Sequence, residues 1–394
     1  MTSAREEFVR WYGKTKKKPE IFESFCPYRV CPLGAHVDHQ YGYVSGFAID
    51  KGIKIVYAPT AGVVRVRSLN FEGEKTFHVD RIPPRQNDWA DYLRGAAWAL
   101  DHRVELKRGL NCVIEGSLPI GGLSSSAAVI IAFLSALCKA NNVRLSRADL
   151  IAVALEAETK YVGVNVGKLD QSCEVYSQKD KLLFLDTKTD RYELIPRSPK
   201  TPPFEIAIFF SGVERRLAGT RFNVRVDELK ASAYALKGWA EMDCGLFSEA
   251  RLRDVPFAVF EKYASRLPEN WRKRATHYYS EVARVKQGAE LWRAGNLKKF
   301  GQLVFESGYS SIHNYETGSE ELRTLYELML EVDGVYGGRF SGAGFKGCCM
   351  ALVDPAKRET VAAKMTAGYL REFPNLEGKF SIHFCQTSNG VDYF

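Results

Sequence analysis

The sequence predicts a mixed α and β protein of two domains, and three features carry this prediction. The chain has 394 residues, about two to three times the length of a typical domain. Strand-like and helix-like patterns alternate along it. Four prolines fall within residues 196–203, which excludes both a helix and a central strand there. We therefore expect a linker in this segment, one domain over residues 1–198 and another over residues 204–394.

Each expected element follows from a local pattern. β-branched and aromatic residues between glycines indicate strands over 27–33, 43–58, 62–79 and 109–116. Apolar residues at helical spacing indicate helices over 88–102, 124–141 and 146–162. After the linker, strands are expected over 205–211, 335–341, 348–353 and 379–385. Helices are expected there over 221–241, 257–266, 270–293, 319–331 and 357–372, so the second half is α+β.

Composition places the chain among folded globular proteins. Hydrophobic residues make up 45% and charged residues 26%, and the formal net charge is +8. Apart from the lysines of residues 14–18, the basic residues do not cluster, so we expect no nucleic-acid partner. A mild positive charge over a long chain would suit an anionic ligand.

Several features predict a cytoplasmic protein that does not enter a membrane. The nine cysteines show no zinc-binding spacing and several have apolar neighbours, which indicates buried, reduced thiols. The N-terminal sequence MTSAREEF is charged and lacks the apolar core of a signal peptide. The longest apolar stretch, residues 127–137, is too short to cross a bilayer.

The strongest local signal is PIGGLSSSAA at residues 119–128, between an expected strand and an expected helix. Two glycines allow close backbone approach, and serines at a helix N-terminus offer N–H groups and hydroxyls to an anion. An ordinary helix cap needs one serine, so three after two glycines favour a phosphate-binding loop. It is not a Walker A loop, because Phe8 stands where the motif before Lys14 and Thr15 requires its first glycine.

A second glycine-rich segment, SGAGFKG at residues 341–347, contains the pattern GxGxxG. A strand pattern follows it, whereas a dinucleotide-binding fingerprint must open a helix, so that interpretation is rejected. A glycine-rich turn between two strands can line a ligand cleft or form only a tight hairpin. The residues alone leave both possibilities open.

Charged residues also occur in two apolar or glycine-rich segments. Arg29, His36 and Asp38 lie on an expected strand and the loop after it, where charge is costly unless it is paired or used. A buried ion pair and a functional role are both open there. Glu158 and Asp170 flank a glycine-rich segment and could hold Mg²⁺ or take a proton, although solvated carboxylates are the default for such a pair.

Four motifs stand in a distinctive order: PYRVCPLGAHVDH at 27–39, GLSSSA at 122–127, GKLDQ at 167–171 and VYGGRFSGAGFKGC at 335–348. They resemble the motifs of the GHMP superfamily (galactose, homoserine, mevalonate and phosphomevalonate kinases), and within it the galactokinase branch. The resemblance runs nearly end to end. It implies an α+β two-domain kinase fold with an N-terminal domain like the second domain of ribosomal protein S5 and a ferredoxin-like C-terminal domain. It also implies ATP and Mg²⁺, bound in a cleft between the domains.

The resemblance assigns roles by position. Asp170 resembles the catalytic aspartate, and Arg29 the arginine beside it. The implied Mg²⁺ ligands are Ser126 and Glu158, the residues near the adenine are Trp89 and Tyr92, and the sugar-binding residues are His36, Asp38 and Gly167. The phosphates would be wrapped by Pro119, Gly121, Gly122, Leu123, Ser124, Ser125, Ser126 and Ala127. The implied reaction is phosphoryl transfer to the anomeric hydroxyl of a sugar, with Asp170 able to accept its proton.

One departure from the family pattern points to a uronic acid. Galactokinases have a glutamate that contacts the C6 hydroxyl where this chain has Ala35. A sugar carboxylate ~4 Å from that glutamate would cost roughly 4 kcal/mol at an effective dielectric constant of 20. Without the glutamate, the main objection to a uronic acid as substrate is removed. The segment LGAHVDHQ at 33–40 closely resembles LGAHIDHQ of plant-type galacturonokinases. We therefore expect galacturonate as the acceptor.

Other positions leave the exact sugar open. Phe222 replaces a sugar-contacting tyrosine, so one hydroxyl contact is missing. A C6 carboxylate needs a cation, for which Lys168 and Arg221 are the nearest candidates, and each is equally suited to be a surface charge. The alternatives are a galactokinase, a kinase for another C6-modified sugar, and a non-catalytic sugar-sensing regulator. A small-molecule partner is expected, and a monomer is slightly favoured.

Overall fold

The first sheet is built around one strand of 18 residues, β2 (Tyr43–Thr60). The structure is a computed structural model, and it describes residues 3–13, 20–213 and 222–392. The other strands of this sheet are β1 (Phe22–Val30), β3 (Val63–Ser68), β4 (Lys75–His78), β5 (Gly109–Gly116), β6 (Lys181–Asp186), β7 (Tyr192–Pro196) and β12 (Thr387–Ser388). The order is β4-β3-β5-β2-β6-β7, with β1 and β12 also pairing with β2. A shift in the register of β1 between Pro27 and Arg29 precedes the end of that strand.

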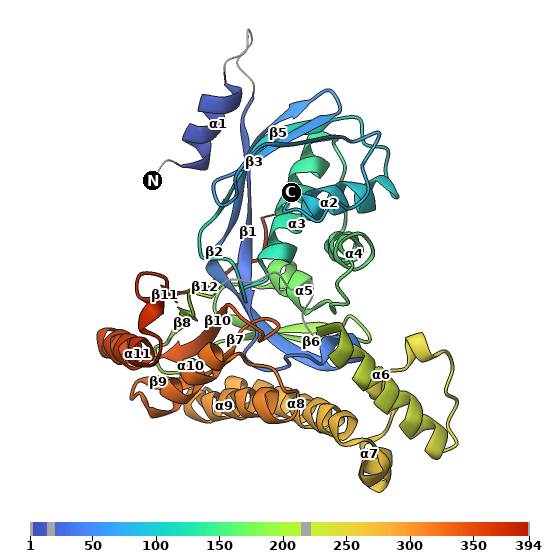
Figure 1. The fold of residues 1–394 in the computed structure, drawn as a ribbon, viewed down its shortest axis with the longest axis vertical. Helices are drawn as coiled ribbons and strands as arrows, with labels where there is room; N and C mark the ends of the chain where they lie inside the picture. Colours follow the sequence, from blue (N-terminus) through green and yellow to red (C-terminus); the bar gives the residue numbers. More distant parts are fainter. Residues whose placement is uncertain (1–2, 14–19, 214–221, 393–394) are drawn as a thin grey trace.

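Helices cover both faces of this sheet. Four of them, α2 (Asp91–Asp101), α3 (Ser125–Ala140), α4 (Arg147–Glu156) and α5 (Leu169–Tyr176), lie on one face, and α1 (Ala4–Tyr12) lies on the other (Figure 1). Successive side chains of β2 point to opposite faces of the sheet, so both faces carry apolar residues that helices can cover. Ile55 belongs to the core that includes α3, whereas Val56 packs with α1. Most residues of α3 are buried, as suits its almost uninterrupted apolar sequence.

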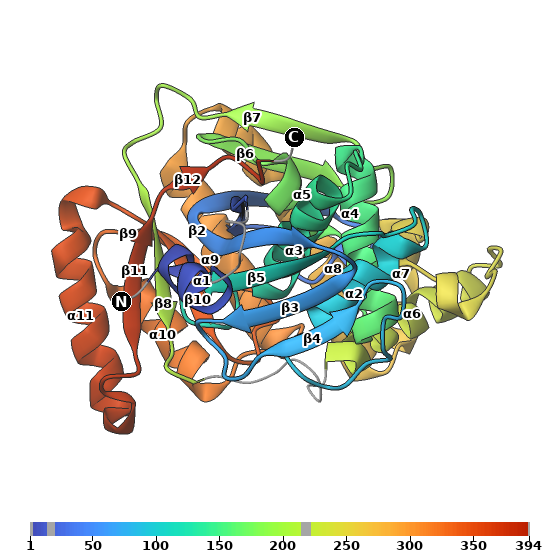
Figure 2. The same cartoon turned by 90° about the horizontal axis from the view of Figure 1, so that it is seen from above.

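The second half forms a smaller antiparallel sheet with its own helices. Its strands are β8 (Glu205–Phe210), β9 (Val335–Phe340), β10 (Cys348–Val353) and β11 (Ser381–Cys385), in the order β11-β8-β10-β9. The helices are α6 (Phe222–Trp239), α7 (Phe257–Tyr263), α8 (Glu269–Arg293), α9 (Leu297–His313), α10 (Glu320–Glu331) and α11 (Arg358–Glu372). α9 and α10 pack on β9, and α11 packs on α10 at the outer edge (Figure 2). α8 lies against α9 and also against β2, β6 and β7, so it joins the two sheets.

The expected elements are found with shifted ends, and one expectation is wrong in detail. The strand predicted over 62–79 is two strands, β3 and β4, separated by residues 69–74. The elements α1, α5, α9, β6, β7 and β12 were not expected. Helix α9 shows why such an element is missed, because Gly301 lowers its helix propensity. A Cβ at this position would clash with the carbonyl oxygen of Tyr336. Glycine therefore lets α9 approach β9 closely.

Two further observations concern the cysteines and the helices. All nine cysteines are free of disulfide bonds and eight are buried, in agreement with the expectation from their apolar neighbours. Within the residues that the structure describes, no helix combines the length and the apolar composition needed to cross a bilayer.

Candidate active site

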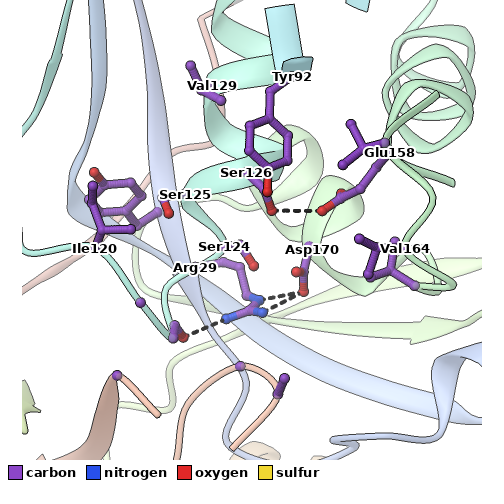
Figure 3. Close-up of a pocket in the computed structure, with 18 of the residues that line it drawn as sticks. Arg29, Tyr92, Ile120, Ser124, Ser125, Ser126, Val129, Glu158, Val164 and Asp170 are labelled. Atoms are coloured by element: carbon purple, nitrogen blue, oxygen red, sulfur yellow. Dashed lines mark hydrogen bonds and ion pairs between the residues drawn. The ribbon is translucent and has the colours of Figure 1, made fainter. Parts of the chain in front are cut away.

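The four motifs converge on one cavity with a volume of ≈ 990 Å³. Its walls come from β1 and the loop after it, the start of α3, the π-helical turn Ala157–Val162, the start of α5, and the loop between β9 and β10 (Figure 3). These segments lie far apart in the sequence. Only the pairing of β1 with β2 and the packing of the two sheets make them neighbours.

Two glycine-rich loops form one wall, with their backbones in contact. Gly121 and Gly122 have φ values of 131° and 86°, which L side chains rarely adopt. A Cβ on Gly121 would lie 3.0 Å from the Cα of Gly347, and one on Gly342 would lie 2.9 Å from the Cα of Gly122. The loop at 341–347 therefore lines the cavity, which supports the cleft-lining interpretation over a bare hairpin.

The N-terminus of α3 opens into the cavity beside these loops. Ser124 precedes the helix with a left-handed φ of 60°, and its side chain does not cap the helix. Its buried hydroxyl has no hydrogen-bond partner among the residues described. The first N–H groups of α3 and this hydroxyl are therefore suited to an anion such as phosphate.

An ion pair joins β1 to α5 at the centre of the cavity. Nε and Nη2 of Arg29 each lie 2.7 Å from Oδ1 of Asp170, and Nη1 donates to the carbonyl oxygen of Gly122 at 3.3 Å (Figure 3). The Arg29 side chain is 4% exposed and that of Asp170 is 21% exposed. The arginine is thus buried behind a carboxylate that faces the cavity. Both contacts between the guanidinium group and Asp170 go to Oδ1, so Oδ2 is left to face a ligand.

A second carboxylate lies beside the loop before α3, residues 119–124, which is called the phosphate loop below after the role expected from its sequence. Oε1 of Glu158 accepts a hydrogen bond from Ser126 Oγ at 2.7 Å, and Oε2 accepts one from Gln171 Nε2 at 2.8 Å. Burial and the nearby Asp170 carboxylate raise the pKa of Glu158 to about 7. The pair of oxygens from Ser126 and Glu158 lines the cavity and is positioned to bind a hard cation.

A third carboxylate, Asp38, lies where the loop after β1 meets the start of α5. It accepts hydrogen bonds from the N–H groups of His39 at 3.0 Å and Leu169 at 3.2 Å. A Cβ on Gly167 would lie 2.3 Å from Oδ2 of Asp38, so the glycine leaves space for this carboxylate. Burial and the Asp170 carboxylate raise the pKa of Asp38 to about 6.

Helix α8 holds the backbone of the loop after β1. The N–H of Gly34 donates to Oε1 of Glu281 at 2.7 Å, and Nε2 of His277 lies 3.0 Å from the carbonyl oxygen of Ala35. Because a carbonyl only accepts, Nε2 of His277 must carry the proton. Burial lowers the pKa of His277 to about 4, so its ring is neutral near pH 7. This segment, residues 34–36, is called the acceptor loop below.

His36 ends the acceptor loop and lines the cavity. Its φ of 63° is left-handed, and its ring stacks on Tyr315 with a centroid distance of 4.2 Å. Phe222, at the start of α6, lies 6.5 Å from His36 between ring centroids and also lines the cavity. Nε2 of His36 is buried and has no hydrogen-bond partner in the part of the chain described.

The opposite end of the cavity is aromatic. Trp89 stacks on Phe71 with a centroid distance of 5.8 Å and an interplanar angle of 7°, and Tyr92 lines the cavity as well. Arg94 pairs with Asp88 at 2.8 Å and with Asp91 at 2.5 Å, which anchors the segment before α2. A flat heterocycle fits such a wall by stacking.

Some predicted site residues do not face the cavity. The predicted residues outside its lining are Pro119, Leu123, Ala127 and Lys168. Leu123 and Ala127 belong to the buried core, and Lys168 pairs with Asp190 at 2.5 Å. Arg221 lies outside the described residues.

The sequence analysis missed the support for the acceptor loop. His277, Glu281 and Tyr315 belong to no motif. The helix predicted over 270–293 includes the first two, but a periodic pattern does not show that its buried face carries polar residues. Gln171 stands inside the motif GKLDQ, whose last position could have been assigned a role.

Comparison with known proteins identifies the family. Sequence profiles described as GHMP kinases N terminal domain and GHMP kinases C terminal match residues 91–178 and 289–370. The chain is 38% identical to a galacturonokinase of Arabidopsis thaliana over 420 aligned residues, which cover 99% of this chain and 97% of the relative. The chain belongs to the GHMP kinase family.

Other relatives of this GHMP kinase agree. A galactokinase of Pyrococcus furiosus is 34% identical and matches over 88% of this chain and 93% of its own length. The structure of Lactococcus lactis galactokinase complexed with galactose superimposes with a TM-score of 0.89 at 28% identity, covering 99% of this chain and 98% of that chain. Methanococcus jannaschii mevalonate kinase, at 16% identity and a TM-score of 0.65, shares the fold over 95% and 100% of the two chains. The family and the two-domain kinase fold expected from the motifs are confirmed.

Glu158→Gln is expected to stabilise the ligand-free protein at alkaline pH. The folded protein raises the pKa of Glu158 from 4.5 to about 7, so ionisation destabilises the fold increasingly as pH rises through that range. The full effect is on the order of 3 kcal/mol. Melting temperatures measured from pH 5 to pH 8 should diverge, with the variant a few degrees higher at pH 8 and close to the parent at pH 5. The exposed Glu261→Gln is the control, and a pH-independent difference would contradict the prediction.

His277→Ala is expected to weaken acceptor binding without affecting the nucleotide. The substitution leaves the buried carbonyl of Ala35 without its donor and releases the left-handed His36 beside it. The KM for the acceptor should rise about tenfold, while the KM for ATP stays within about twofold. His277→Gln, which can still donate, should recover part of the loss, and the exposed Gln287→Ala on the same helix should have no effect. Equal changes in both KM values would show a general structural role instead.

Proposed function

We propose that this GHMP kinase transfers the γ-phosphoryl group of ATP to the anomeric C1 hydroxyl of D-galacturonate. The observation that carries the choice of acceptor is Ala35, which lines the cavity beside His36 where a glutamate would repel a sugar carboxylate. The 38% identity to a galacturonokinase over 99% of the chain supports the same acceptor.

The central ion pair suits phosphoryl transfer. Asp170, facing the cavity, would accept or orient the proton of the C1 hydroxyl as that oxygen attacks the phosphorus. Arg29 would keep the carboxylate in place and offset the negative charge that builds up on the transferring group. The glycine loops and the N-terminus of α3 would bind the phosphates, and the wall around Trp89 would bind the adenine.

The oxygens of Ser126 and Glu158 fit Mg²⁺. They lie 2.7 Å apart on the cavity wall, and Mg²⁺ prefers oxygen ligands. In the described parts of the chain, no group of three or more His, Cys, Asp or Glu side chains is suited to hold a metal ion. Phosphate oxygens and water would therefore complete the coordination, as is usual for this ion. When bound, Mg²⁺ would neutralise phosphate charge, and Glu158 would give up the proton that its raised pKa favours.

The C6 end of the sugar would face Ala35, His36 and Phe222. Ala35 brings no negative charge, and Phe222 brings no hydroxyl. Lys168 does not line the cavity and pairs with Asp190, which argues against it as a partner for the carboxylate. We therefore assign to His36, whose buried Nε2 has no partner among the described residues, the hydrogen bond to a carboxylate oxygen.

Asp170→Asn is expected to lower kcat by at least about a hundredfold while the Kd of ATP stays unchanged. The amide keeps the shape of the side chain but cannot accept the hydroxyl proton. Steady-state kinetics and calorimetric titration with ATP separate the two effects. Asp333→Asn, in a surface ion pair with Lys357, is the control and should retain full turnover. Near-native kcat in Asp170→Asn would contradict the assigned role.

Ala35→Glu is expected to shift specificity from galacturonate toward galactose. The new carboxylate would repel the C6 carboxylate and could bind a C6 hydroxyl, so the ratio of kcat/KM for galacturonate to that for galactose should fall at least tenfold. Ala35→Gln separates charge from size, because it adds the same bulk without the charge and should change the ratio less.

Activity assays of the unmodified protein with several sugars test the proposal directly. ATP with galacturonate, galactose, glucuronate or arabinose, followed by analysis of the product, should give phosphorylation at C1 and a preference for galacturonate. A preference for galactose would overturn the acceptor but leave the kinase intact. Absence of turnover on every sugar, with retained ATP binding, would instead indicate a sugar-sensing regulator.

A further inference from the structure

Lys346 lines the active-site cavity but has no part in the site described above. It lies in the loop between β9 and β10, whose backbone is held on both sides. The N–H of Gly318 donates to the carbonyl of Gly344 at 2.7 Å, and the N–H of Ser211 donates to the carbonyl of Gly347 at 2.8 Å. The backbone of Lys346 is therefore confined between two anchored glycines, and its four-carbon side chain is the part free to move.

This loop lies directly against the phosphate loop. A Cβ on Gly347, the residue after Lys346, would lie 2.8 Å from the carbonyl oxygen of Gly121 and 3.0 Å from the backbone nitrogen of Gly122. Only glycines permit such an approach of two backbones. Lys346 therefore lies one residue away from the contact between Gly347 and the phosphate loop.

No acidic side chain among the described residues forms an ion pair with Lys346. Among the described residues that line the cavity, the cationic ones are Arg29, Arg85 and Lys346. Arg29 pairs with Asp170, and Arg85 reaches toward Gly163 after the π-helical turn. An unpaired ammonium group beside a phosphate-binding backbone is suited to bind an anionic oxygen.

We propose that Lys346 binds the phosphate groups of ATP through its ammonium group and helps to hold the triphosphate on the phosphate loop. Gly342 and Gly347, on either side of Lys346, lie against Gly121 and Gly122, whereas the backbone of the acceptor loop is held by α8. The contacts of this loop therefore favour the phosphates over the sugar carboxylate as the anion bound by Lys346. The proposal depends on ATP as the phosphoryl donor and not on which sugar accepts.

Binding experiments with the full-length protein test this role. Lys346→Ala should raise the Kd of ATP about tenfold to a hundredfold in calorimetric titrations, because a charge-assisted contact is lost. The Kd of adenosine, which has no phosphate, should not change. Lys346→Arg should recover most of the affinity, and the Kd of ATP should depend less steeply on salt in Lys346→Ala than in the parent. Lys364→Ala, on the exposed face of α11, removes the same charge outside the cavity and should have no effect.

Two results would overturn the proposal. If the Kd of ATP is unchanged in Lys346→Ala, the lysine does not bind phosphate. If instead kcat/KM falls for galacturonate but not for galactose, while ATP binding is retained, Lys346 binds the sugar carboxylate. Melting temperatures of all variants should match that of the parent, which excludes misfolding as the cause of lost affinity. Because titration with ATP requires no sugar, these experiments are decisive even if the preferred acceptor is galactose.

Discussion

The ion pair between Arg29 and Asp170 is the interaction on which the rest of the site depends. It connects β1 to α5, and its second contact, to the carbonyl of Gly122, connects both to the phosphate loop. A buried guanidinium without its carboxylate would be costly, so the packing of β1 against α5 and the position of Asp170 depend on each other. The same pairing leaves one carboxylate directed at the cavity with its charge balanced from behind.

The electrostatics of the cavity follow from this arrangement. Five carboxylates line it: Asp170 pairs with Arg29, and Asp88 and Asp91 pair with Arg94, whereas Asp38 and Glu158 have no ion pair among the residues described. Repulsion and burial therefore raise the pKa of each of the other two, to about 6 for Asp38 and about 7 for Glu158. The approach of a cation or of hydroxyl donors would favour the ionised forms of these two groups. Ligand binding and the protonation of the site are thus coupled.

The second half of the chain determines the shape of the acceptor loop. Gly34 and Ala35 follow β1, yet their backbone is held by Glu281 and His277 of α8. Glu281 is in turn paired with Arg284 at 2.8 Å and Arg339 at 3.4 Å, so the support reaches β9 of the smaller sheet. The shape of the acceptor loop therefore depends both on its own residues and on the polar face of α8 that holds it.

The sequence by itself determined the family, the two-domain α+β character and many residues of the cavity, because the glycines, serines and carboxylates stand in short motifs that can be recognised locally. It could not place Lys168, whose charge is taken by Asp190, nor detect the role of His277, because both depend on residues distant in the chain. Lys346 shows the same limit. Its residue type was visible, but only the contact between two glycine loops decided that it lies close to Gly121 and Gly122, since burial and proximity arise from packing and not from sequence spacing.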